Sequence, residues 1–169
     1  MGAAETKNEK NQTAVDETNG LSVEEKNLIR SSWEQIMKNK RKVGVDVFVR
    51  LFTNYPKSKE LFEQLRDIPT EDLRNHKKMK AHALRVMASL NSVVESLDDL
   101  EILGEMLQNV GRTHVLHHVE KHYYDSLAVV LLEAFEDELK DKFNQKTRNA
   151  WTKAYGAMEK VIVEAYGDA

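Results

Sequence analysis

From residue 21 onward, apolar residues recur along the chain at steps of three and four positions, which is the spacing of an amphipathic α-helix. The first such stretch begins after Ser22, which has Glu25 three positions later, the spacing of a capping box. The apolar positions that follow on one helical face are Leu28, Ile29, Trp33, Ile36 and Met37. The pattern predicts a first helix that starts directly after Ser22.

The segment of residues 43–55 fits two patterns. In its first part every second residue is Val or Leu, as in a strand, whereas Val45, Phe48 and Phe52 recur at the spacing of a helix. We interpret it as a helix because no second segment of the chain is a candidate strand that could pair with it. The helix should end before Pro56, because a proline disfavours the helical conformation of the residue that precedes it.

Two long helical patterns follow Pro69, and each has a histidine on its apolar face. Asn75 is the predicted N-cap of the first helix, and either Asp98 or Asp99 is that of the second. The face of the first helix comprises Met79, His82, Val86, Leu90, Val93 and Leu97. The face of the second comprises Leu100, Leu103, Leu107, Val110 and His114. The two histidines are therefore predicted on the buried sides of separate helices.

The remaining sequence predicts two more helices and completes an all-α fold of six or more helices without a sheet. Their apolar faces comprise Tyr124, Leu127, Leu131 and Phe135, and then Trp151, Tyr155, Met158, Ile162 and Ala165. Residues 1–20 contain no aromatic residue, Leu or Ile, and carry four acids against two lysines. We therefore expect a disordered N-terminal tail at 1–20 and a single folded domain at 21–169.

The composition excludes several classes of function. The 169 residues include 25 basic and 28 acidic side chains, and no sustained basic block offers a surface for nucleic acid. There is no Cys, which excludes thiolate metal sites, and no Gly-rich phosphate loop or zinc-binding His pair. No apolar run is long enough to span a membrane and no secretory signal is present, so we expect a cytoplasmic protein.

The histidines are the main candidates for chemistry. His76, His117, His118 and His122 fall at predicted helix ends or in a loop, where a solvated side chain is the simplest interpretation. A single histidine on an apolar face is more often a hydrogen-bonded core residue than a ligand. His82 and His114 together, however, would need two separate buried partners, whereas a cofactor with apolar walls and a central iron would satisfy both.

Several segments, in this order, resemble the globin family. They are Leu28–Trp33, Val47–Phe52 with Tyr55-Pro56 and Phe62, Ala81–Met87, Val110–His114 and Thr147–Trp151. The resemblance covers residues 21–169 and is to the neuroglobin, cytoglobin and globin X branches. It implies the globin fold, with six to eight helices around a haem pocket.

The resemblance also implies the cofactor and its binding residues. The cofactor would be haem b, iron protoporphyrin IX, with His114 as the proximal and His82 as the distal iron ligand. Phe62 would stack on the macrocycle, and Phe48 and Val86 would form the distal wall. The other implied cofactor-binding residues are Val110, which opens the proximal motif, and Arg85 and His118 or His117, which are candidates for the propionates.

By this resemblance, the chain would reversibly bind dioxygen, NO and CO, with His82 on the iron when no external ligand is present. Competition from His82 would lower the apparent ligand affinity, which favours a redox, NO, nitrite or sensing role over bulk oxygen storage. Two alternatives stay open. One is a haem enzyme, a nitrite reductase or NO dioxygenase that depends on an external reductase, and the other is a helical interaction module without a cofactor.

The first six residues, Met1–Thr6, match the pattern for N-myristoylation at Gly2. Globin X proteins are similar in having an acylated N-terminal tail, although the cysteine for a second acyl chain is missing here. One myristoyl chain gives only marginal membrane binding. We therefore expect membrane contact only through acylation of Gly2.

Overall fold

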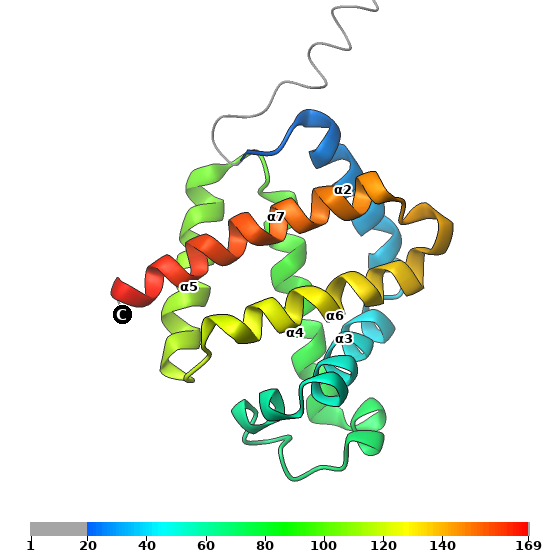
Figure 1. Ribbon diagram of the computed structural model, residues 1–169, viewed down its shortest axis with the longest axis vertical. Helices are drawn as coiled ribbons and strands as arrows, with labels where there is room; N and C mark the ends of the chain where they lie inside the picture. Colours follow the sequence, from blue (N-terminus) through cyan, green and yellow to red (C-terminus); the bar gives the residue numbers. More distant parts are fainter. Residues whose placement is uncertain (1–19, 169) are drawn as a thin grey trace, which may run out of the picture.

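The computed structural model describes residues 20–168, which form an all-α fold (Figure 1). The α-helices are α2 (Val23–Lys38), α3 (Lys40–Asn54), α4 (Lys77–Glu95), α5 (Leu100–Leu116), α6 (Lys121–Leu139) and α7 (Gln145–Glu164). Four short 3₁₀ segments accompany them: η1 (Pro56–Leu61), η2 (Thr70–Asn75), η3 (Lys140–Lys142) and η4 (Ala165–Asp168). The predicted all-α fold class is confirmed. The predicted N-terminal tail, except for Gly20, and the predicted acylation site at Gly2 lie outside the described residues.

The first helix begins, and the second helix ends, where the sequence indicates. The Ser22 hydroxyl accepts a hydrogen bond from the Glu25 amide at 3.1 Å, and the Glu25 carboxylate accepts one from the Ser22 amide at 2.7 Å. This reciprocal pair is the predicted capping box. Residues 40–54 are helical, which settles the ambiguous segment in favour of the helix, and α3 ends two residues before Pro56.

The predicted cap of α4 was wrong. Asn75 is the last residue of η2, so its backbone is already helical and cannot start a new helix. His76 has the extended backbone of an N-cap instead, and its Nδ1 accepts a hydrogen bond from the Lys78 amide at 3.3 Å. For α5, the alternatives resolve to Asp99, whose carboxylate accepts from the Ile102 amide at 3.1 Å.

Aromatic side chains from three helices form the centre of the core. Trp33 of α2, Phe135 of α6 and Trp151 of α7 are buried and contact one another, with ring centroids 5.0 to 5.9 Å apart. Both indole nitrogens donate hydrogen bonds, from Trp33 to Asn91 Oδ1 at 3.0 Å and from Trp151 to Ser32 Oγ at 2.9 Å. Both tryptophan side chains are therefore buried with their indole N–H groups hydrogen-bonded.

The two helices that carry the candidate histidines pack against different partners. In Figure 1, α6 and α7 run side by side in opposite directions in front of α4 and α5. Helix α4 packs mainly on α3, and α5 packs mainly on α7. Helices α4 and α5 therefore do not pack along each other, although they follow one another in the chain. Within residues 20–168, no helix has the length and apolar character needed to cross a bilayer.

Candidate functional site

His82 lies on α4 between the edges of two aromatic rings. Its imidazole is 4.7 Å from the Phe48 ring at an interplanar angle of 75°, and 5.1 Å from the Phe62 ring at 83°, measured between centroids. Phe48 belongs to α3 and is buried, and Phe62 directly follows η1 and is half-buried. Two separate segments thus restrict the orientation of the His82 ring, and these three predicted site residues are brought together.

The surroundings keep the His82 imidazole neutral. Burial is the main cause that lowers its pKa to about 4, and the positive charge of Arg85 and the nearby His114 lower it further. The imidazole forms no hydrogen bond with any residue of the described range 20–168. His82 is therefore a neutral, half-buried base, held in place by apolar contacts and without a protein partner for its ring nitrogens.

His114 differs, because one of its ring nitrogens is engaged. Nδ1 lies 2.8 Å from the carbonyl oxygen of Val110, one turn earlier in α5. Since a carbonyl only accepts, Nδ1 carries the proton and donates, which leaves the lone pair of the ring on Nε2. Burial lowers the pKa of His114, and the bond to Val110 opposes this in part. A backbone-oriented neutral imidazole of this kind is suited to bind a metal through Nε2.

The other predicted residues surround this pair unequally. Val86 and Val110 are half-buried and pack against the core, each one turn from a candidate histidine. Arg85 is exposed, but its charge acts on His82. His118 is exposed and has a φ of 57°, and no hydrogen bond, ion pair or ring contact joins it to His82 or His114 within the described residues. His117 is exposed as well and, if charged, lowers the pKa of His114.

A tyrosine cluster beside His114 was not predicted as part of the site. The Tyr124 ring lies 6.1 Å from the His114 ring, and its hydroxyl is 3.1 Å from that of Tyr166. Tyr166 also donates to the Val119 carbonyl at 2.6 Å, and Tyr155 donates to the Tyr124 carbonyl at 3.0 Å. These bonds fasten the segment that follows His114 to the C-terminal helices.

The sequence contains a signal for this cluster. Tyr124 and Tyr155 fall at apolar positions of their helices, where a buried hydroxyl needs a partner. Burial raises the pKa of both hydroxyls, and for Tyr124 the hydrogen bond with Tyr166 adds to the effect. Both side chains therefore stay neutral at physiological pH.

Comparison with known proteins gives the family. The Globin family profile matches residues 45–162. Cytoglobin-2 of Oryzias latipes is 34% identical over 148 residues, which are 86% of this chain and 83% of that protein. Neuroglobin of Dissostichus mawsoni is 33% identical over 136 residues, 80% of this chain and 86% of that protein. The chain therefore belongs to the globin family, and this membership implies a haem cofactor and the binding of small diatomic ligands.

The fold itself matches a solved structure. A hexacoordinated haem protein from an anhydrobiotic tardigrade, crystallised at pH 4, superimposes with a TM-score of 0.84. The match covers 90% of this chain and 99% of that protein, at 22% sequence identity. At this identity, the likeness supports the globin fold alone.

Proposed function

We propose that this globin holds haem b between α4 and α5, with His114 as the proximal and His82 as the distal ligand. The observation that carries the proposal is the state of His82, a neutral imidazole fixed by Phe48 and Phe62 and without a protein hydrogen bond. An iron atom bound by His114 would give this unpartnered imidazole a metal to coordinate. The electrostatic effect of His114 on the pKa of His82 supports their proximity.

The residues present fit a haem better than a free metal ion. No group of three or more His, Asp or Glu side chains within residues 20–168 could enclose an ion. The imidazoles of His82 and His114 could hold a haem iron from two separate helices, and the macrocycle would supply the ligands that the protein lacks. Because α4 and α5 each pack on another helix, such a group can lie between them without disrupting their main contacts.

The two histidines have different tasks in this proposal. His114 is held by the Val110 carbonyl in the tautomer that presents Nε2, so it would stay on the iron permanently. His82 is held only by ring contacts, so its imidazole would be the more easily displaced of the two ligands and could donate a hydrogen bond to an external ligand in the site. When bound, the haem supplies an iron that takes diatomic ligands and changes its oxidation state.

We infer a six-coordinate resting state with both histidines on the iron. The free ring nitrogens of His82 support this state, as does the identity of 32 to 34% with the cytoglobins of two fishes. The tardigrade protein of the same fold is called hexacoordinated. Since ligand affinity falls with the fraction of protein whose distal site is open, a redox, NO, nitrite or sensing role is favoured over storage. A separate reductase would then supply electrons.

The test is the absorption spectrum of the haem-loaded protein in its ferric and ferrous forms. Wild type should give a six-coordinate, low-spin spectrum in both states, and His82→Leu should give a five-coordinate spectrum in the ferrous state. His122→Leu is the matched control, because His122 is exposed on α6, and it should keep the wild-type spectrum. An unchanged six-coordinate spectrum of His82→Leu would refute His82 as the sixth ligand.

A further inference from the structure

Helices α3 and α4, with η2 beside them, enclose a hollow of about 360 Å³ on the surface. It is lined by Arg41, Lys42, Val45, Arg74, Lys80 and Leu84. Lys80 and Leu84 are each two residues from His82, about 200° away around α4, so they lie on the opposite side of the helix. The hollow is therefore separate from the site between α4 and α5. Its volume is within the range of small-molecule sites.

The charges around this hollow are unbalanced. Its lining contains four cations and no carboxylate. Lys42 and Arg74 share Asp46, and Lys42 also contacts Glu138 at 2.7 Å. The side chains of Arg41 and Lys80 are exposed and have no hydrogen bond or ion pair with any residue of the described range. Even with both carboxylates counted, the hollow keeps an excess of two positive charges.

The starts of the two helices add to this positive potential. The N-terminus of a helix is the positive end of its dipole and favours acidic side chains. Helix α3 instead begins with Lys40, Arg41 and Lys42, and α4 begins with Lys77 and Lys78, without an acid in either first turn. Helices α2 and α5 carry Glu in this position. Helices α6 and α7 also lack an acid in the first turn, but Lys121 at the start of α6 is paired with Asp125 and Glu159. At the hollow, a bound anion would relieve the unfavourable arrangement.

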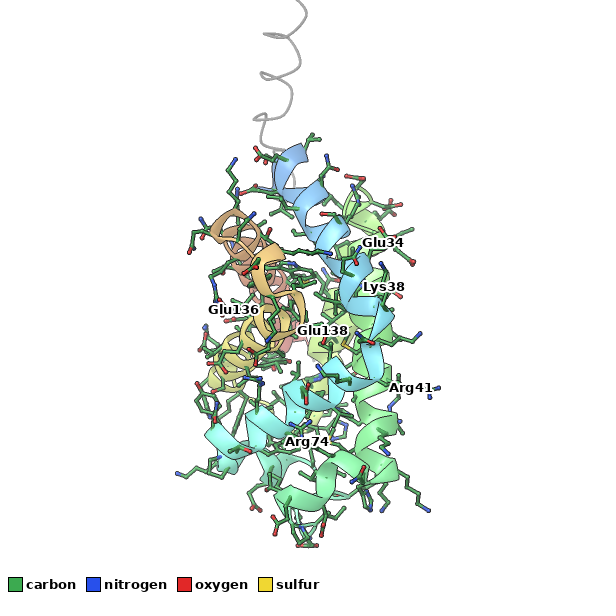
Figure 2. The ribbon with its side chains drawn as sticks, turned by 90° about the vertical axis from the view of Figure 1, so that its right-hand side faces the viewer. Glu34, Lys38, Arg41, Arg74, Glu136 and Glu138 are labelled. Atoms are coloured by element: carbon green, nitrogen blue, oxygen red, sulfur yellow. The ribbon has the colours of Figure 1, made fainter. Side chains whose placement is uncertain are left out.

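We propose that the hollow binds an organic phosphate whose phosphoryl group carries two negative charges. The Arg41 guanidinium and the Lys80 ammonium are the free cations, and a guanidinium matches two phosphate oxygens at once. Val45 and Leu84 are the apolar part of the lining and would contact the organic moiety. In Figure 2, Arg41 projects outward from the start of α3 and Arg74 lies on the segment before α4, and both side chains line the hollow.

The two runs of basic residues are 35 positions apart in the sequence, and the packing of α3 on α4 brings them together. This inference does not depend on the haem proposal. The phosphate could be on a free metabolite or on the headgroup of an anionic lipid, and the chemistry of recognition is the same for both.

The test uses haem-loaded protein, with phenyl phosphate as the soluble probe in isothermal titration calorimetry. The lipid probe is phosphatidylcholine vesicles with and without phosphatidic acid, in a sedimentation assay. We expect saturable binding of phenyl phosphate with one site, tighter than that of inorganic phosphate because of the apolar lining. Arg41→Gln/Lys80→Gln should weaken it at least tenfold. Binding to phosphatidic acid vesicles alone, lost in this variant, would support the proposal with a lipid as the source.

The matched control is Lys57→Gln/Lys160→Gln, which removes the same charge from exposed positions on η1 and α7. It should bind as wild type does, and so should His82→Leu, because His82 lies on the other side of α4. The proposal is overturned if neither probe binds, if Arg41→Gln/Lys80→Gln binds like wild type, or if the control loses as much affinity. Circular dichroism of each variant checks that it has the helical content of the wild-type protein.

Discussion

Gly111 on α5 lies against the backbone of Ile162 on α7 so closely that a Cβ on Gly111 would come 2.2 Å from the Ile162 carbonyl oxygen. A real Cβ never approaches an oxygen to this distance, so the two helices meet at a spacing that only glycine permits. His114 follows Gly111 by three residues on α5. The position of the proposed proximal ligand is therefore set in part by this backbone contact.

Gly111→Ala should destabilise the protein, because the added methyl group forces α5 away from α7. Overpacking of this kind costs about 1–3 kcal/mol in the free energy of unfolding. The control is Gly104→Ala on the same helix, where the added Cβ has no atom within 4 Å apart from its chain neighbours and the adjacent backbone of α5. It should be neutral or stabilising by up to about 1 kcal/mol, because Ala favours a helix. Urea unfolding of both variants measures this, and equal stabilities would contradict the contact.

The half-buried His82 makes the haem-free protein sensitive to mild acid. Its pKa is lowered from 6.5 to about 4 in the folded state, mainly by burial, so the unfolded chain takes up this proton first. The free energy of unfolding should therefore fall as the pH drops from about 6.5 to 4, by up to about 3 kcal/mol from this group. Urea unfolding of the haem-free protein at several pH values measures the slope.

His82→Leu removes this titration, so the stability of the variant should fall less over the same range. A part of the slope remains, because burial lowers the pKa of His114 too. If His82→Leu and wild type lose stability equally, the folded protein does not keep His82 neutral.

The edge-to-face contacts of His82 should determine how often the distal site opens. Phe62→Leu removes one of the two rings that orient the imidazole, and such a pair contributes about 0.5–1.5 kcal/mol. The open fraction of the ferrous protein should therefore rise by up to about tenfold, seen as faster CO binding at limiting CO. Phe135→Leu is the control, since Phe135 packs against Trp33 and Trp151. Equal CO-binding rates in both variants would contradict this role of Phe62.

The sequence predicts most of the fold because its signals are local. The capping box at Ser22 and the helical period of residues 43–55 depend on neighbours within one or two turns, and both appear as expected. The predicted N-cap of α4 was wrong because Asn75 belongs to the 3₁₀ segment η2, which precedes α4. Such a short segment has no apolar period that could be recognised in the sequence.

The candidate site is predictable in part. The apolar periods place His82 and His114 on the inner faces of two helices, but they do not show that Phe48 and Phe62 enclose one histidine while Val110 orients the other. The ring contacts of His82 depend on how distant segments cross, and the bond between His114 and Val110 depends on the side-chain rotamer of His114 within α5. The basic hollow was missed because its two basic runs are distant in the sequence, and because each run is too short to stand out there.

The haem content of His114→Ala tests the central claim most directly, that the imidazoles of α4 and α5 hold one iron between them. Wild type, His114→Ala and the control His122→Ala are loaded with equimolar haem, and their Soret absorbance is recorded after gel filtration. Wild type and His122→Ala should keep the pigment with a low-spin spectrum. His114→Ala should lose most of it or change to a different spectrum. A variant that keeps its haem as tightly as wild type, with identical spectra, would contradict the account.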